Sequence, residues 1–167
     1  MDDPGSIILK LLLLFVLVII NAFFAMSEIA IISLNENVVD KQAEDGNKKA
    51  KKVKKLTENP SNFLSTIQIG VTLAGFLTSA SASSSFADVL AKKLVALGTP
   101  VSEGVIHGVS IVLITLIMSY FSLVFGELAP KRMAMQKPEK IAYSVVGVLL
   151  VVKTVTAPFV KVLSAST

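Results

Sequence analysis

The sequence predicts an all-α integral membrane protein: three transmembrane helices, short cytosolic helices and an amphipathic juxtamembrane helix, assembled as a dimer. Of its 167 residues, 53% are hydrophobic and 17% are charged, whereas roughly 25% of the residues of a soluble domain are charged. The mean hydropathy is +0.71, and the apolar residues gather in runs long enough to cross a bilayer. This composition excludes both a water-soluble enzyme and a disordered chain.

Side chains suited to catalysis are scarce. The chain has no cysteine and a single histidine, His107, so disulfides, thiolate metal sites and a Ser-His-Asp arrangement are not expected. We find no nucleophile paired with a base, no redox cofactor motif and no glycine-rich phosphate loop, and therefore expect no enzyme activity. His107 is expected to be an interface residue near the outer end of the third span.

The first transmembrane helix is expected over residues 7–34. Its centre, from Leu11 to Ile20, carries no charge, and its length exceeds the ~20 residues needed to cross a bilayer. The chain begins with acidic rather than basic residues and lacks a convincing cleavage site, so we interpret this helix as retained and not as a signal peptide.

A charged segment over residues 36–58 follows and predicts a pair of short cytosolic helices, broken near Gly46 and Asn47. Residues 48–55 hold six lysines in eight positions, and short lysine-rich loops stay on the cytoplasmic side. Nucleic-acid binding is not expected, because the lysines lack interleaved aromatics and the segment is tied to the membrane.

The second transmembrane helix is expected over 60–85, within a stretch that is free of charge from residue 60 to residue 87. Gly70, Gly75 and the serine-rich tract 79–85 are small residues that let helices approach closely. We therefore expect a homodimer that pairs through small-residue faces of the second and third helices. A short helix over 86–97 is expected at the far side of the membrane.

The third transmembrane helix is expected over 103–127 and returns the chain to the cytoplasm, where Lys131 and Arg132 anchor it. Three crossings place the N-terminus outside, with the lysine-rich loop and the C-terminus cytoplasmic. The last apolar stretch, within 138–164, is long enough for a fourth span. It also has one strongly apolar face and contains two lysines, so an interfacial helix is equally compatible with its hydropathy.

Two carboxylates fall within or at the end of spanning segments, Glu28 and Glu127, and a charge at membrane depth is by default a functional hypothesis. Pro130 has no N–H, so it frees the carbonyl of Gly126 from its usual helical bond. A free carbonyl beside a carboxylate suits a hard cation such as Mg²⁺. Alternatively, each carboxylate lies at headgroup level and pairs with a nearby lysine. Oxygens of the second helix could complete such a site, with plain helix packing as their alternative role; the candidates are Gln68, Gly70, Thr72 and Gly75.

Three motifs together resemble the transmembrane domain of the CNNM/CorC family, also called cyclin M or hemolysin-C-like proteins. They are NAFFAMSEIA at 21–30, FLSTIQIGVTLAG at 63–75 and GELAPK at 126–131. The resemblance covers essentially the whole chain. It implies a dimer with three spans per protomer and an interfacial helix after the third. Full-length members continue into cytosolic CBS domains, so the chain looks like the membrane domain alone.

The resemblance also implies transport of magnesium or a related divalent cation, described as export coupled to sodium. In the family pattern Glu127 helps to hold the dehydrated cation, and Pro130 and Lys131 belong to the turn around it. The complete set of metal ligands expected here is Glu127, Gly126, Ser27, Gln68 and Gly70, with Glu28 as a further intramembrane carboxylate. Ala25 and Val71 stand where members with a well-formed magnesium site tend to have serine and asparagine.

Two alternatives to magnesium transport follow. Family members with the pattern at 68–73 include proteins linked to polyamine export, so an organic amine is the alternative cargo. A non-transporting membrane anchor for cytosolic CBS sensor domains is the alternative function. Intramembrane hydroxyls and the two glycines of the second helix favour transport, because an anchor built of leucine and valine would not need partners for them.

Overall fold

The computed structural model describes residues 4–98 and 101–166, and no β-strand occurs in this part of the chain. The prediction of an all-α protein is confirmed. The elements in chain order are α1 (Pro4–Ile32), α2 (Glu36–Glu44), α3 (Lys48–Thr57), α4 (Pro60–Ala96), α5 (Glu103–Leu123), the π-helical turn η1 (Val124–Leu128), α6 (Ala129–Gln136) and α7 (Pro138–Ser166).

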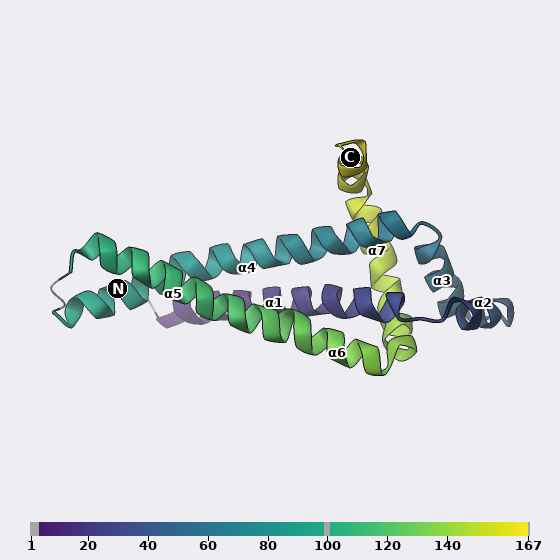
Figure 1. Cartoon of the computed structure of the whole chain (residues 1–167), viewed down its shortest axis with the longest axis horizontal. Helices are drawn as coiled ribbons and strands as arrows, with labels where there is room; N and C mark the ends of the chain where they lie inside the picture. Colours follow the sequence, from purple (N-terminus) through teal and green to yellow (C-terminus); the bar gives the residue numbers. More distant parts are fainter. Residues whose placement is uncertain (1–3, 99–100, 167) are drawn as a thin grey trace.

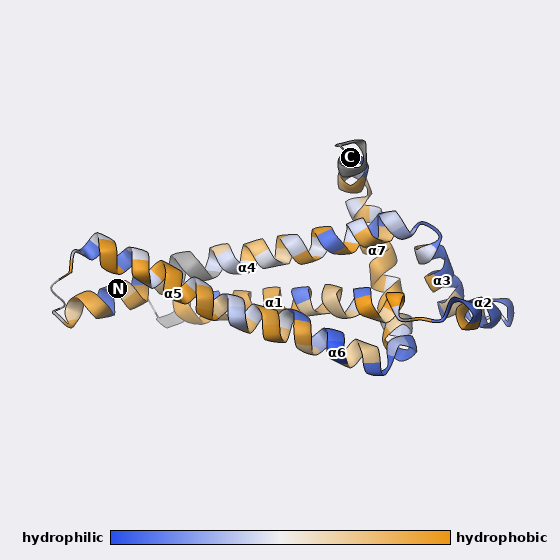
Figure 2. Ribbon diagram, in the orientation of Figure 1, coloured by the Kyte–Doolittle hydropathy of each residue, from blue (hydrophilic) through white to orange (hydrophobic). Residues whose placement is uncertain are grey.

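Three long rods form the body of the molecule: α1, α4, and the nearly continuous run of α5, η1 and α6 (Figure 1). Both α1 and α5 pack against α4, and their outward faces are strongly apolar (Figure 2). Large side chains on these three helices remain exposed, among them Phe15 of α1 at 66% and Phe76 of α4 at 70%. Exposed apolar surface of this extent is stable only in lipid or against a partner. The chain is therefore a membrane protein.

Asparagine caps explain where α2, α3 and α4 begin. The side chains of Asn35, Asn47 and Asn59 each accept a hydrogen bond from a backbone N–H in the first turn of the helix that follows. Between α2 and α3, Gly46 adopts φ +92°, a left-handed conformation that glycine reaches without a steric penalty. Two short helices thus lie where the sequence predicts a pair, with α2 ending at Glu44 and α3 beginning at Lys48.

An ion pair holds the two short helices together. Lys54 Nζ of α3 lies 2.8 Å from Asp40 Oδ1 of α2, and both side chains are half exposed. The hydrogen bond to Asp40 raises the pKa of Lys54 above its usual value.

The second transmembrane segment is longer than the sequence predicts. A break between residues 85 and 86 is expected from the change in character, but α4 runs unbroken from Pro60 to Ala96. No proline or glycine lies between Gly75 and Gly98, and serine does not by itself end a helix. At 1.5 Å per residue α4 is about 55 Å long, more than the ~30 Å hydrocarbon core. The third helix likewise extends past residue 127, through η1 to Gln136.

α7 has a different direction from the other long helices. It crosses one end of the three rods, whereas the rods run alongside one another (Figure 1). By length and composition four stretches could span a membrane: α1, α4, α5 through α6, and α7. The sequence leaves α7 open between a fourth span and an interfacial helix, and its crosswise direction favours the interfacial helix.

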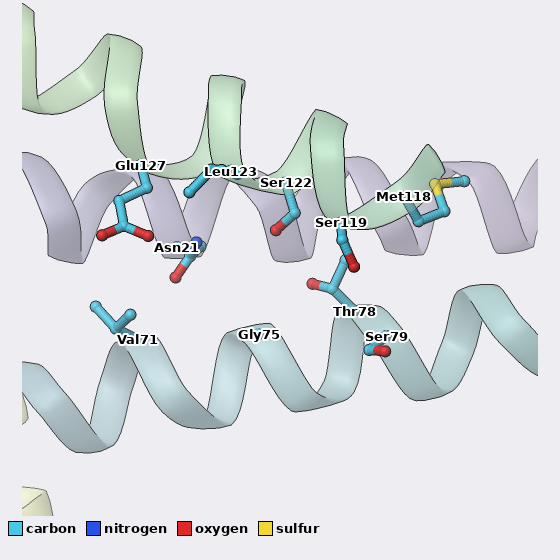
Figure 3. A pocket seen from close by; sticks show the side chains of 10 residues that line it. All are labelled: Asn21, Val71, Gly75, Thr78, Ser79, Met118, Ser119, Ser122, Leu123 and Glu127. Atoms are coloured by element: carbon cyan, nitrogen blue, oxygen red, sulfur yellow. The ribbon is translucent and has the colours of Figure 1, made fainter. Parts of the chain in front are cut away.

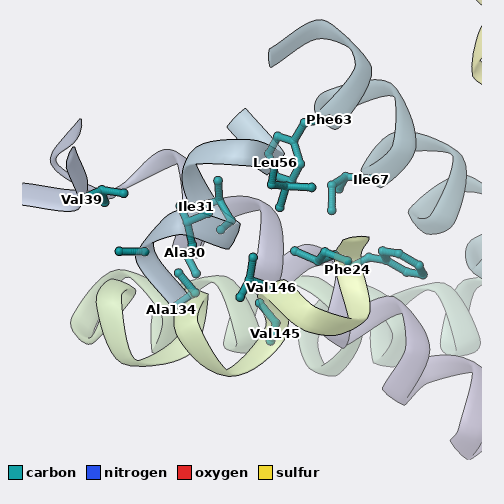
Figure 4. Packing of buried hydrophobic residues seen from close by; sticks show 14 of the residues in the cluster. Phe24, Ala30, Ile31, Val39, Leu56, Phe63, Ile67, Ala134, Val145 and Val146 are labelled. Atoms are coloured by element: carbon teal, nitrogen blue, oxygen red, sulfur yellow. The ribbon is translucent and has the colours of Figure 1, made fainter. Parts of the chain in front are cut away.

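The main core lies at the end of the rods that α7 crosses. Leu56, Ile67 and Leu149 are each 1% exposed and come from α3, α4 and α7 (Figure 4). Residues of α1, α2 and α6 join the same cluster, among them Ala30, Val39 and Ala134. Six helices are thus fixed to one another at this end, which anchors the segments that carry Glu28 and Glu127.

Candidate cation-binding site

A pocket of about 370 Å³, lined by both polar and apolar residues, opens between α1, α4 and the α5–η1 segment (Figure 3). Asn21 and Glu127 lie side by side at one end of it and face Val71 of α4. The remaining lining residues are Gly75, Thr78, Ser79, Met118, Ser119, Ser122 and Leu123. The pocket lies inside the helix bundle, so a polar ligand here would be surrounded by spanning segments.

Asn21 is the most unusual group in this pocket. Its side chain is 5% exposed, and its Oδ1 is a buried oxygen that has no hydrogen-bond partner among the described residues. A buried acceptor left unpaired costs about 1–3 kcal/mol, so such groups call for an explanation. A cation, or a donor carried by a ligand, would supply the missing partner. Asn21 is not among the ligands predicted from the sequence. A polar amide within an uncharged apolar run could have indicated it.

A π-helical turn positions Glu127 next to Asn21. The N–H of Ala129 donates to the carbonyl of Val124, five residues back, and Gly126 is buried inside the turn. A Cβ added at Gly126 would lie 2.9 Å from Asn21 Nδ2, so only glycine allows this close approach of η1 to α1. Pro130 has no N–H to donate to the ordinary helical ladder. The missing N–H of Pro130 thus accounts for the departure from regular α-helix at η1. Single π-helical turns of this kind are frequent at functional sites.

Glu127 also belongs to a three-residue ion-pair network. Lys131 Nζ donates to Glu127 Oε1 at 2.8 Å and lies 3.4 Å from Glu28 Oε2. The three side chains are between 25% and 34% exposed, which places them at the margin of the bundle. One lysine therefore contacts both carboxylates, in line with the alternative that each of them pairs with a lysine.

The other predicted ligands lie elsewhere. Ser27 is fully buried and donates to the carbonyl of Phe23 at 2.6 Å, so its hydroxyl serves its own helix. Gln68 is exposed and lines, with Thr72, an apolar groove against the end of α7. The ring of Phe24 packs directly against Gly70. A Cβ added at Gly70 would lie only 2.6–2.7 Å from atoms of that ring. Of the predicted set, Glu127 lines the pocket and Gly126 adjoins it.

Hydroxyls that the sequence reading did not assign to the site take part in the pocket. Ser119 and Ser122 are three residues apart and so share one face of α5. Thr78 of α4 is 3% exposed and donates to the carbonyl of Ala74 at 2.7 Å, which leaves its oxygen able to accept. The spacing of the two α5 serines was a readable signal.

The donor set is one of mixed oxygens rather than clustered acids. Within residues 4–98 and 101–166, no group of three or more histidine, cysteine, aspartate or glutamate side chains gathers around a common point. A cation in this pocket would rely on one carboxylate, an amide oxygen, hydroxyls and water. Hard cations accept such oxygen sets, and Mg²⁺ usually keeps several of its waters.

His107 lies at the opposite end of the rods from α7. Its Nε2 is 2.7 Å from Asp88 Oδ1, a contact that joins α5 to α4. Both side chains are about half exposed. His107 thus lies at a helix interface near the predicted outer end.

Comparison with known proteins places this arrangement in a family. The family described as "Cyclin M transmembrane N-terminal domain" (CNNM) matches residues 12–167. The chain belongs to the CNNM family. The helix pair after the first span, the GELAPK turn and the crossing helix are thus parts of a CNNM transmembrane domain, and the resemblance found in the three motifs is confirmed.

Curated relatives of this CNNM domain are longer proteins. UPF0053 protein sll0260 of Synechocystis is 43% identical over 98% of this chain and 36% of its own length. UPF0053 protein YhdT of Bacillus subtilis is 31% identical over 99% of the chain and 35% of its own length. UPF0053 inner membrane protein YfjD of Escherichia coli is 31% identical over 89% of the chain and 31% of its own length. The chain spans about a third of the length of these relatives.

Proposed function

We propose that this CNNM domain moves a cation across the cell membrane, with magnesium or a related divalent ion as cargo, and that it works as an exporter driven by sodium. The observation that carries the proposal is the buried, unpartnered Oδ1 of Asn21, a residue that lines the pocket together with Glu127. A membrane anchor has no need of such a group, because an unpaired amide at membrane depth only destabilises it.

The pocket is large enough for an ion that keeps part of its hydration shell. At roughly 30 Å³ per molecule, its 370 Å³ is comparable to the volume of about twelve waters. The Asn21 amide, the Glu127 carboxylate and the hydroxyls would contact the cargo directly or through these waters. The charge comes from Glu127, and the neutral oxygens shape the site.

An organic polyamine is the second candidate cargo. Val71 presents methyl groups to Glu127 across the pocket, where an oxygen would serve a small dehydrated ion better (Figure 3). A diamine would place one ammonium at Glu127 and lay its methylene chain against Val71 and Leu123. The size of the pocket suits this cargo too.

The orientation proposed here has α1, α4 and α5–α6 crossing the membrane and α7 lying along its inner surface. The crosswise direction of α7 and its packing on the lysine-bearing α3 support this arrangement. The lysines of α3 then stay cytoplasmic and the N-terminus lies outside. In the whole protein, CBS domains would follow α7 on the cytoplasmic side.

Single-cysteine labelling tests this topology cleanly, because the native chain has no cysteine. In intact cells, Leu97→Cys should react with a membrane-impermeant maleimide from outside, and Lys51→Cys and Ser166→Cys should react only after the membrane is opened. Leu97 is 77% exposed, which makes it a sound external control. Outside labelling at position 166 would make α7 a fourth span and overturn the interfacial assignment.

A homodimer completes the proposal. A Cβ added at Gly75 meets no atom within 4 Å, so this part of α4 remains open for a close helix neighbour or for the cargo. The exposed apolar faces of α4 and α5 offer further surface for a second copy, as in other membrane helices that associate through small residues.

Glu127→Gln tests the cargo site, because it keeps the size and hydrogen bonding of the side chain and removes its charge. The thermal stability of the purified protein should rise with MgCl2 or, for the second candidate, with putrescine, since a ligand of the folded state stabilises it by mass action. The variant should lose about tenfold in apparent affinity, or about 1.4 kcal/mol. Equal responses of the two proteins to both ligands would refute a site at Glu127.

A further inference from the structure

The contacts of Lys131 divide the network into two unequal halves. Its ammonium is hydrogen-bonded to Glu127 at 2.8 Å and lies farther from Glu28, at 3.4 Å. Glu127 lines the pocket, whereas Glu28 is absent from its lining. One carboxylate thus faces both the pocket and the lysine, and the other faces the lysine outside the pocket. The ammonium of Lys131 is therefore bonded to Glu127, the carboxylate that a cationic cargo would bind.

We propose that Lys131 is a tethered competitor of the cargo: its ammonium holds Glu127 while the pocket is empty, and moves to Glu28 when a cation takes Glu127. This inference rests on the proposed function and assigns roles to two residues outside the pocket. Lys131 sets the affinity of the site, and Glu28 receives the displaced ammonium. Both are positioning residues, because neither touches the cargo.

Charge and geometry allow the Lys131 ammonium to move from Glu127 to Glu28 at a small cost in free energy. Two carboxylates share one ammonium, so one negative charge is unmatched while the pocket is empty. A divalent cargo changes the net charge of these three side chains and the cargo from −1 to +1, and Lys131 keeps a carboxylate partner throughout. A buried charge left without a partner is strongly destabilising, and the presence of Glu28 avoids that state. The lysine stem is long and its side chain 29% exposed, so a small shift of Nζ can be made without unfolding the turn.

The three groups lie on three separate elements of the chain. Glu28 lies on α1, Glu127 within η1 and Lys131 on α6. The π-helical turn separates Glu127 from the regular helix that carries Lys131. Local adjustment of that turn can alter the distance from Glu127 to Lys131 while Glu28 stays on α1. The exchange therefore needs no movement of the main core.

The test measures apparent affinity for MgCl2, and separately for putrescine, by ligand-dependent thermal stabilisation of the full chain in lipid nanodiscs. Choline chloride keeps the ionic strength constant. Lys131→Gln should bind the active cargo at least threefold more tightly than wild type. Glu28→Gln should bind it at least threefold more weakly, because the lysine then stays on Glu127. Adding Glu28→Gln to Lys131→Gln should have no effect.

One control variant and four further outcomes decide the test. Arg132→Gln removes a neighbouring exposed charge that should act only through long-range repulsion, so an increase equal to that of Lys131→Gln would overturn the competition. A loss of affinity from Glu28→Gln in both backgrounds would make Glu28 a direct ligand and would also overturn it. Unchanged affinity in Lys131→Gln, with wild type responding, defeats this inference alone. If the cargo stabilises Lys131→Gln but not wild type, the competition is supported. If the cargo stabilises neither protein, the proposed function fails together with this inference.

A measurement without cargo checks the ion pair itself. Glu127→Gln should lower the melting temperature of the wild-type protein more than that of Lys131→Gln, because the charge removed has a partner only in the first. Equal shifts in the two backgrounds would mean that Lys131 and Glu127 are not coupled, and the proposal would fail regardless of the cargo.

Discussion

Asn21→Leu should raise the stability of the cation-free protein and lower its affinity for cargo by tenfold or more. The buried Asn21 oxygen lacks a hydrogen-bond partner among the described residues, and leucine branches at the same carbon without a polar group. Relief of the unpaired acceptor should contribute about 1–3 kcal/mol to the free energy of unfolding. Loss of the amide oxygen removes a neutral ligand beside Glu127. The two effects have opposite signs, as expected for a group kept for function at the expense of stability.

Thermal unfolding with and without MgCl2 or putrescine measures both effects. The matched control is Thr66→Val, because Thr66 is 2% exposed but donates to the carbonyl of Asn62 and lies outside the pocket. It should not stabilise the protein and should leave the response to cargo unchanged. If Asn21→Leu instead lowers stability and keeps the full response, the amide is a packing group and the pocket loses its main support.

Much of the fold can be predicted from the sequence, because helix starts and apolar runs are each determined by residues close together in the chain. Asn35, Asn47 and Asn59 mark three helix starts, and Gly46 marks the break between α2 and α3. The end of α4 was misplaced because the change after the serine-rich tract, from an uncharged stretch to an amphipathic one, alters the environment of a helix without breaking it. The direction of α7 is a tertiary property, set by packing on α1, α3 and α4, and hydropathy carries no information about it.

Only those residues of the candidate site whose type is unusual inside a spanning helix could be predicted from the sequence. Glu127 and Pro130 stand out because a charge and a proline are both costly inside a spanning helix. Ser27 and Gln68 are equally polar in the sequence, yet one bonds to its own helix and the other faces the end of α7. Which face of a helix turns inward depends on a neighbour far away in the chain. The pairing of Glu28 with Lys131, 103 positions apart, could not be read from spacing for the same reason.

Gly70→Ala should destabilise the protein, whereas Gly75→Ala on the same helix should not. An added Cβ at Gly70 would lie 2.6–2.7 Å from the ring of Phe24, which is itself 9% exposed and held in the core cluster. Overpacking of this kind typically costs about 1–3 kcal/mol. At Gly75 an added Cβ meets nothing within 4 Å inside the protomer, so the fold of the protomer should gain up to about 1 kcal/mol from the better helix propensity of alanine.

The comparison of melting temperatures also decides what Gly70 is for. If it serves as space for Phe24, a second substitution that shortens the ring, Phe24→Leu, should restore part of the stability lost in Gly70→Ala. The affinity for cargo should then stay close to that of wild type, because Gly70 does not line the pocket. If the doubly substituted protein recovers its stability but no longer responds to cargo, Gly70 is a ligand after all. The cation would then bind nearer the start of α4, on the Phe24 side of Val71, and not beside Asn21.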